Sequence, residues 1–222
     1  MINQDQVVIE NSTQELIVST KISKGDKYLP ADILLKIYNS CDDIRDKSYL
    51  MFHAEVGLRV SDIVGQKKRV KGNERKRSTE RELGLEVVNI EWQNLRARVY
   101  DHKKDKWRFV YFPDKVKAQL LQYIKWRQAN GIVHRQLFPF SEKTCNRILK
   151  KWCRRVGFQY AASIGSHWLR HTFIRLSRKA GRDIKAVQQN TGDTVKTLLE
   201  WYSDLSMEDM RDEIEGKPIV KA

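Results

Sequence analysis

The 222-residue chain has few of the residues that form disulfide frameworks and no long apolar run. It contains 3 cysteines and 4 prolines, and no apolar stretch approaches the roughly 18 residues that cross a bilayer. Cys41, Cys145 and Cys153 are odd in number and lack CxxC spacing, which predicts reduced thiols and no structural metal. Residues 1–20 lack a basic segment followed by an apolar core, so no signal peptide is predicted.

Acidic residues are also in the minority. The chain has 42 Lys and Arg against 28 Asp and Glu, a net charge of +14. This balance favours a polyanionic partner, with nucleic acid ahead of an anionic membrane surface; general solubility is the alternative. No acidic cluster with metal-ligand spacing accompanies the cations, which disfavours a metal-dependent nuclease.

Hydrophobic periodicity predicts a mainly α chain with a small antiparallel β-sheet, an α+β fold. Residues 1–26 carry short β-like runs at 7–9 and 16–18 but are too short for a domain, so we assign one domain to 27–222. Helices are expected from Tyr28 through Ile37 and near 43–55, 114–130, 141–156, 167–180, 183–190, 194–202 and 206–216. Strands are expected at 85–90, 95–100 and 107–112, the last two joined as a hairpin by the polar turn 101–106.

Residues 65–82 interrupt these patterns as a basic insertion. Between Lys67 and Arg81 lie eight basic and two acidic residues, with almost nothing apolar. Such a run is typical of a solvated, mobile segment, and a phosphate-contacting loop is the alternative. Both interpretations stay open, because basic segments can become ordered on nucleic acid.

Two cationic residues, His167 and Arg170, lie one helical turn apart and are expected to project from the same face of a helix. Upstream, the segment Gly57–Asp62 contains Arg59. Arginine stays charged and donates bidentately to phosphate oxygens, so Arg59 and Arg170 could clamp the non-bridging oxygens of one phosphodiester. A single arginine in either place would more often be a surface or ion-pair residue.

Three further side chains complete a possible site for phosphoryl transfer. His167 is a candidate general base or hydrogen-bond donor, and Tyr202, which follows Arg170 by 32 residues, is a candidate nucleophile. Lys103 in the hairpin turn is a candidate acid for a leaving oxygen, with Lys104 and Lys106 as competitors. Each has an ordinary alternative: a core or capping histidine, a tyrosine on an apolar helical stripe, and a solvated lysine.

In this order and spacing, the set resembles the catalytic residues of the tyrosine recombinases (phage-type integrases). Gly57–Asp62 is similar to the first box of that family, and His167–Phe173 is similar to its HxLRHTF box. The resemblance extends from about Tyr28 to the C-terminus. It implies the tyrosine recombinase catalytic-domain fold, with Asp62 orienting Arg59 and Lys103 as the hairpin lysine.

The same resemblance implies a site-specific DNA recombinase or integrase, of the kind found on mobile elements and in viruses. Such an enzyme cleaves and rejoins double-stranded DNA through a covalent 3′-phosphotyrosine, here at Tyr202, without metal or cofactor. Self-association into a dimer or tetramer on DNA, no membrane contact, and a cytoplasmic or nucleoid-associated location in a prokaryotic host would follow. The alternatives are a topoisomerase or telomere resolvase, or a DNA-binding protein of this fold with weakened catalysis.

Two positions depart from the family pattern. Nine residues before Tyr202, where the family has His or Trp, stands Asp193. A carboxylate there would repel the phosphate unless it were protonated or paired with His171 or a lysine, although a neutral acid could still donate a hydrogen bond. Residues 1–26 cannot form the helical DNA-binding domain that usually precedes this fold, and the insertion 65–82 is a hypothetical replacement. The tail helix 206–216 is expected to dock on a neighbouring protomer or on its own domain.

Overall fold

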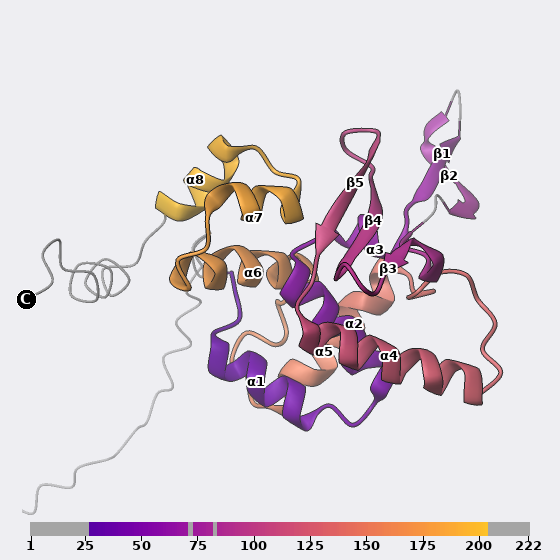
Figure 1. Cartoon of the computed structure of the whole chain (residues 1–222), viewed down its shortest axis with the longest axis horizontal. Coiled ribbons are helices and arrows are strands. Elements are labelled where there is room, and N and C mark those ends of the chain that lie inside the picture. The colour runs from indigo at the N-terminus through magenta and orange to yellow at the C-terminus, as the bar shows by residue number, and fades with distance from the viewer. Residues whose placement is uncertain (1–26, 71–72, 82–83, 204–222) are drawn as a thin grey trace, which may run out of the picture.

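The computed structural model describes residues 27–70, 73–81 and 84–203, and at 67–70, 73–81 and 201–203 it describes the backbone alone. In chain order the elements are α1 (Ala31–Ser40), α2 (Ile44–Val56), α3 (Val60–Val64), β1 (Lys67–Val70), β2 (Asn73–Arg81), η1 (Val87–Asn89), β3 (Ile90–Glu91), β4 (Arg96–Asp101), β5 (Lys106–Tyr111), α4 (Asp114–Ala129), α5 (Glu142–Arg155), α6 (His167–Lys179), α7 (Ile184–Thr191) and α8 (Val195–Ser203). The mainly helical fold with a small antiparallel sheet confirms the predicted fold class (Figure 1).

Helix starts follow local capping chemistry. Ser141 accepts a hydrogen bond from the Thr144 N–H at 3.0 Å and caps α5. At α4, Pro113 occupies the N-cap and Asp114 is the first helical residue. There its charge still interacts favourably with the positive end of the helix dipole.

Two apolar clusters hold the fold together. The larger one joins α1–α5 with the sheet and includes the fully buried Tyr49, Phe52, Phe138 and Trp152. The smaller one is built from α6, α7 and α8 and contains Phe173, Ile174, Val187 and Leu198. In Figure 1 these three helices, in orange and yellow, form a group beside the β4–β5 hairpin.

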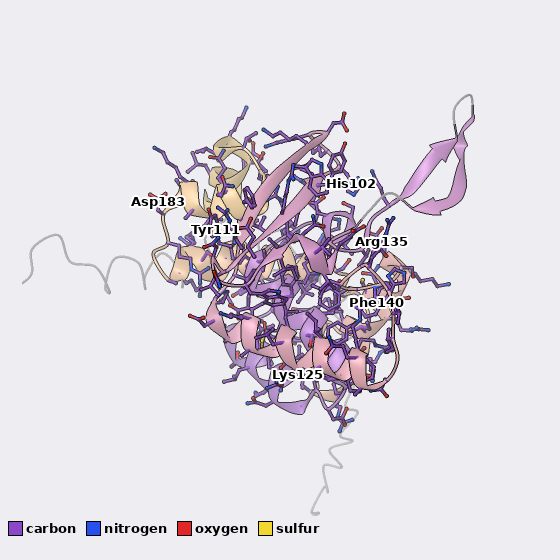
Figure 2. The ribbon with its side chains drawn as sticks, turned by 45° about the vertical axis from the view of Figure 1, so that its right-hand side comes forward. His102, Tyr111, Lys125, Arg135, Phe140 and Asp183 are labelled. Atoms are coloured by element: carbon purple, nitrogen blue, oxygen red, sulfur yellow. The ribbon has the colours of Figure 1, made fainter. Side chains whose placement is uncertain are left out.

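The β4–β5 hairpin forms as predicted, in a sheet of order β3-β4-β5 with Ala97 opposite Val110. Its outer strand β5 is covered by α7. The Gln189 side-chain amide donates to the Phe109 carbonyl at 2.8 Å, and Asn190 both accepts from the Tyr111 N–H and donates to the Tyr111 carbonyl. These amides satisfy backbone groups at the open edge of the sheet and fix the hairpin to α7. Tyr111, at the end of β5, is labelled in Figure 2.

The strand predicted at 85–90 was largely wrong. Val87–Asn89 form a single 3-10 turn, and β3 is confined to Ile90–Glu91. The backbone before the turn pairs with another segment, since the Leu137 N–H donates to the Leu85 carbonyl at 2.8 Å and the Val87 N–H donates to the Arg135 carbonyl at 3.0 Å. This run of β-branched residues therefore lines a loop contact instead of extending the sheet.

Within the basic insertion, the described residues form two antiparallel strands, which we did not predict from the sequence; whether the segment is mobile or contacts phosphate stays open. Strands β1 and β2 pair with Val70 opposite Asn73 and Lys67 opposite Arg81, with register shifts between. Backbone hydrogen bonds between strands need no apolar side chains, which explains why composition gave no signal. In Figure 1 the hairpin projects from the body next to β3 and β4.

Predicted elements at 1–26 and 206–216 lie outside the described residues. Within the described ranges, no helix has both the length and the apolarity to cross a bilayer.

Candidate active site

The end of α2 lies very close to α6, and this contact positions the first arginine. Gly57 ends α2 with φ +73°, and a Cβ at this position would overlap the Phe173 ring. The close approach lets Arg170 Nη1 donate to the Gly57 carbonyl at 2.8 Å. Arg170 is 4% exposed, so its guanidinium is held inside the protein with one edge on the backbone.

The second arginine, Arg59, is the residue before α3 and reaches the same place from another element. Its Nη1 lies 3.4 Å from Asp101 Oδ1 and its Nη2 lies 2.7 Å from Asp193 Oδ1. The expectation that Asp62 orients Arg59 was wrong as regards direct contact. Asp62 is buried and pairs with Arg108 at 3.5 Å, and it is Asp101 that holds Arg59.

Arg108, on β5, joins the two halves of the site. Its guanidinium contacts the buried carboxylates of Asp62 (3.5 Å) and Asp101 (3.4 Å). It also donates to the carbonyls of residues 189–191 at the end of α7, at 2.9, 2.8 and 3.3 Å. Gly192 follows with φ +70°, and a Cβ there would lie 2.7 Å from Asp101 Oδ2 and 2.9 Å from Arg108 Nε. The turn after α7 therefore packs directly on this ion pair.

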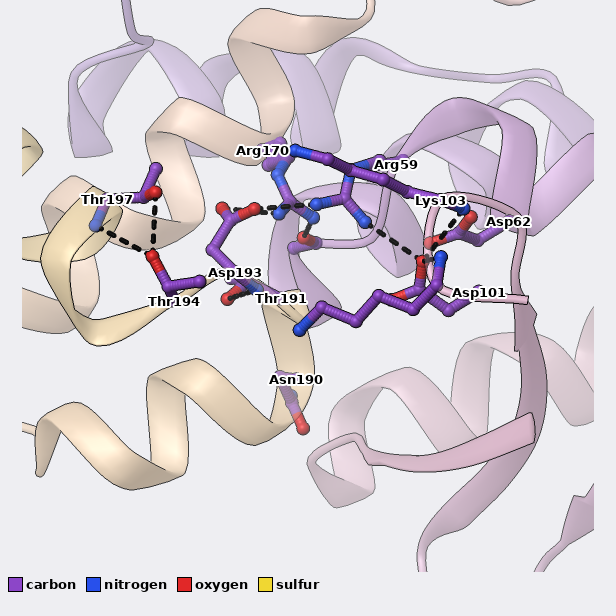
Figure 3. Close-up of polar contacts among 12 residues, drawn as sticks. Arg59, Asp62, Asp101, Lys103, Arg170, Asn190, Thr191, Asp193, Thr194 and Thr197 are labelled. Atoms are coloured by element: carbon purple, nitrogen blue, oxygen red, sulfur yellow. Dashed lines mark hydrogen bonds and ion pairs between the residues drawn. The ribbon is translucent and has the colours of Figure 1, made fainter. Parts of the chain in front are cut away.

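Asp193 lies between the two arginines. Its Oδ1 is 2.7 Å from Arg59 Nη2 and its Oδ2 is 2.5 Å from Arg170 Nη2. Figure 3 shows the carboxylate facing both guanidinium groups. From the sequence, protonation or pairing with His171 or a lysine were the conditions under which a carboxylate here would not repel phosphate, and the structure pairs Asp193 with the two arginines themselves.

Burial shapes the charges of this cluster. Burial raises the pKa of Asp62 above its ordinary value, although Arg108 and Arg59 act in the opposite direction. Burial also lowers the pKa of Arg170, which Asp193 partly offsets and the neighbouring Arg59 reinforces. Two guanidinium groups this close repel each other, so the site has a strong electrostatic demand for one anion between them.

The hairpin tip carries the candidate acid. Asp101 Oδ1 accepts from the backbone N–H groups of Lys103 and Lys104, each at 3.1 Å, and so fixes the turn. Lys103 is exposed, and in Figure 3 its side chain extends from the hairpin toward Asp193 and the end of α7. Lys104 and Lys106 are exposed as well. The choice of Lys103 among the three therefore stays a prediction.

His167 is the first residue of α6 and is exposed, one turn before the buried Arg170. Its ring lies 6.5 Å from that of His171. Tyr202 lies in the last turn of α8, and its side chain is outside the described part of the chain. The structure thus brings Arg59, Arg170, Asp193 and Lys103 together, and it places the backbone of the tyrosine on the helix that directly follows the Asp193 turn.

Sequence reasoning missed three residues of the site. Asp101 pairs with Arg59, Arg108 pairs with Asp101, and His53 supports the turn that leads to Arg59. An aspartate that opens a polar hairpin turn is a recognisable signal. The alternation of Trp107, Arg108 and Phe109 gave no comparable signal, because the partners of Arg108 are distant in sequence.

His53 is buried, and its Nε2–H donates to the Leu58 carbonyl at 3.0 Å while Nδ1 accepts from the Tyr49 hydroxyl at 3.0 Å. Burial lowers the pKa of His53 from 6.5 to about 3, with smaller contributions from the charges of His167 and Arg170. The imidazole is therefore neutral in the folded protein, and it ties α2 to the residue before Arg59.

This histidine predicts acid sensitivity. The unfolded chain binds a proton at His53 near pH 6.5 and the folded chain near pH 3, so the stabilisation is complete above pH 6.5 and is lost as pH falls toward 3. From pH 7 to 5 the free energy of unfolding should drop by about 2 kcal/mol from this group. Urea unfolding of wild type and His53→Gln at pH 7 and pH 5 isolates the contribution of this histidine to the free energy of unfolding. The variant should lose less with pH, and equal losses would contradict the assignment.

Among the described residues, no three His, Cys, Asp or Glu side chains come together as metal ligands. The expectation of a metal-free and cofactor-free reaction stays a prediction. The groups that are present are suited to holding a phosphate by charge and hydrogen bonds.

The fold is that of a tyrosine recombinase catalytic domain. The crystal structure of XerA recombinase superposes with a TM-score of 0.69 at 21% identity, covering 87% of this chain and 64% of that one. XerH recombinase, solved bound to its difH substrate, gives a TM-score of 0.60 at 16% identity, covering 83% of this chain and 52% of that one. The phage integrase family model matches residues 79–209, and the chain belongs to this family.

Curated relatives agree with this assignment. Tyrosine recombinase XerA of Saccharolobus solfataricus is 28% identical over 178 residues, which cover 80% of this chain and 52% of the relative. XerA of Pyrococcus horikoshii is 26% identical over 223 residues, covering 95% and 68%. Transposase A of transposon Tn554 from Staphylococcus aureus is 24% identical over 214 residues, covering 90% and 55%. The chain spans about half the length of the first and third of these relatives.

Proposed function

We propose that this chain is the catalytic part of a site-specific DNA recombinase or integrase that cleaves and rejoins DNA through Tyr202. The observation that carries the proposal is the convergence of Arg59 and Arg170, from separate elements, on the two oxygens of one carboxylate. A site that holds a two-oxygen anion in this way suits the non-bridging oxygens of a phosphodiester. Family membership supports the same chemistry.

In the proposed reaction, the Tyr202 oxygen attacks the scissile phosphorus and the bond from phosphorus to the 5′-oxygen breaks. His167 accepts the phenol proton, since a phenol needs help to ionise near neutral pH. Lys103 donates a proton to the departing 5′-oxygen. Arg59 and Arg170 stabilise the negative charge that gathers on the non-bridging oxygens in the transition state.

The product is a 3′-phosphotyrosine and a free 5′-hydroxyl. One phosphoester has replaced another, so the bond energy is kept and no nucleotide cofactor is consumed. Attack by a 5′-hydroxyl from the same or another strand reverses the step and releases Tyr202. Rejoining to another strand is recombination, and rejoining to the same strand relaxes supercoils.

Double-stranded DNA is the proposed partner. The net charge of +14 and the eight basic residues of the insertion 65–82 favour contacts with the phosphate backbone. The XerH structure contains its DNA substrate. Self-association on DNA belongs to the same proposal, because exchange between two duplexes requires more than one active site.

A second candidate is a DNA-binding protein of this fold with weakened catalysis. The pairing of Asp193 with both arginines favours it, since this carboxylate occupies the place that a phosphate would need. The two functions differ in whether a covalent intermediate forms.

A suicide duplex with a nick close to the cleavage site separates the candidates. Cleavage releases the short fragment that carries the 5′-hydroxyl, and its loss prevents rejoining and traps the covalent intermediate. The proposal expects a DNA adduct that resists denaturant, and peptide mapping should place it on the segment containing Tyr202. Tyr202→Phe should bind the duplex as wild type does and form no adduct. Binding without adduct by wild type would support the second candidate, whereas an adduct on another residue would contradict the assigned nucleophile. Plasmid relaxation compared with two-site exchange then tests recombinase against topoisomerase.

A further inference from the structure

We propose that Asp193 is an internal phosphate mimic that keeps the site closed until a DNA phosphodiester displaces it. The inference rests on the proposed function and concerns the regulation of the same site. It goes beyond the departure visible in the sequence, because the carboxylate is not beside the anion site but inside it.

The contacts of Asp193 are those of a bridging anion. Each carboxylate oxygen pairs with one arginine: Oδ1 lies 2.7 Å from Arg59 Nη2, and Oδ2 lies 2.5 Å from Arg170 Nη2. Non-bridging oxygens of a phosphodiester offer the same pair of acceptors to the same two donors. A phosphate and the carboxylate cannot occupy this place together.

The charge balance of the cluster leads to the same conclusion. Its charged members are Arg59, Arg108 and Arg170 and, opposite them, Asp62, Asp101 and Asp193. Arginines and carboxylates are equal in number among these six residues, so the ion-pair cluster is neutral while Asp193 is in place. If Asp193 leaves, the cluster has one excess positive charge, which the single negative charge of a phosphodiester neutralises.

Asp193 is the carboxylate placed to leave. Asp62 and Asp101 are at most 1% exposed and are held by Arg108, whereas the Asp193 side chain is 13% exposed on a turn between two helices. The left-handed Gly192 precedes it, and Thr194 follows with its hydroxyl capping α8 at the Thr197 N–H, 3.1 Å away. One residue therefore separates Asp193 from the helix that carries Tyr202, and displacement of the carboxylate acts directly on that helix.

The test compares Asp193→Asn with Asp183→Asn. Asparagine keeps the size of Asp193 and removes its charge. Asp183 is the N-cap of α7, whereas Asp193 follows the C-terminal end of that helix. Asparagine caps a helix as well as aspartate does, so the control removes the same charge away from the site. Asp193→His, which restores the residue type of the family pattern, is the second variant in case the amide impairs folding.

Two readouts are used. Calorimetric titration with inorganic phosphate measures the anion site itself, and adduct formation on the nicked duplex measures the chemistry. Removing the internal competitor should tighten phosphate binding and speed adduct formation by about tenfold or more. In the variant, no carboxylate has to leave Arg59 and Arg170 before the anion binds. Asp183→Asn should match wild type in both readouts.

The outcomes separate this inference from the proposed function. Unchanged or weaker phosphate binding by Asp193→Asn and Asp193→His overturns the mimic, whether or not wild type forms the adduct. Tighter phosphate binding without adduct from any variant upholds the mimic and overturns the proposed function. Phosphate binding should tighten equally in the Tyr202→Phe background, where no adduct forms. Tighter binding with slower adduct formation would also contradict the inference, since Asp193 would then assist catalysis.

Discussion

Replacing Arg170 with lysine should slow single-turnover adduct formation by about 10³-fold, the scale on which preorganised donors act in a dry site. The guanidinium serves two partners at once, with Nη1 on the Gly57 carbonyl and Nη2 toward the anion site. A lysine ammonium keeps the charge but lacks the planar fork, so it cannot hold both partners in this geometry. Rapid-quench measurements on the nicked duplex give the rate.

Arg178→Lys is the matched control, because it makes the same exchange on the same helix outside the site. Arg178 is half-buried and keeps its charge in this exchange, so the rate should stay within about twofold of wild type. Affinity for the duplex should change little in either variant, since a cation is retained. A loss below tenfold for Arg170→Lys would show that charge alone, and not the forked hydrogen bonding, is what this position supplies.

Replacing Arg108 with glutamine should lower the free energy of unfolding by about 3–5 kcal/mol, as expected when one partner of a buried ion pair is removed. The change leaves Asp62 and Asp101 buried without their shared cation. It also removes the donor for three backbone carbonyls at the end of α7. Urea unfolding followed by circular dichroism measures the loss.

Arg98→Gln serves as the control on the neighbouring strand. Arg98 is exposed and lies over the Trp107 ring at 4.9 Å, so its removal should cost less than about 1 kcal/mol. Arg108→Lys should recover part of the stability, since one ammonium can meet a carboxylate but not all of these acceptors. Equal stability of Arg108→Gln and Arg98→Gln would mean that the two carboxylates are neutral or hydrated in the folded protein.

Local patterns in the sequence were sufficient for most of the fold. The helix containing His167 and Arg170 and the hairpin around Lys103 follow from periodicity and turn residues over short windows. The same patterns failed at 85–90, where β-branched residues serve a loop contact, and at 65–82, where strand pairing needs no apolar side chains. β-propensity reports a half-buried surface and does not determine which segment will provide the partner.

The sequence indicated the members of the site but not their pairing. Arg59 meets Asp101 and Asp193 across 42 and 134 positions of the chain, and such distances leave no trace in a local window. The family resemblance implied that Asp62 orients Arg59, and in the structure Asp62 pairs with Arg108 instead. Asp193 was recognised as a departure from the family pattern, yet its role depends on two arginines that only the folded chain brings together.

The electrical neutrality of the six-ion cluster also bears on the proposed DNA partner. A neutral, partly dry cluster contributes little to the long-range electrostatic field, so the excess charge of +14 resides on residues outside the cluster. Under the proposed function, these peripheral lysines and arginines set the encounter rate with DNA and its salt dependence, and the cluster sets the turnover. Mutations outside the cluster are then expected to change how often the protein meets DNA without changing how fast it reacts.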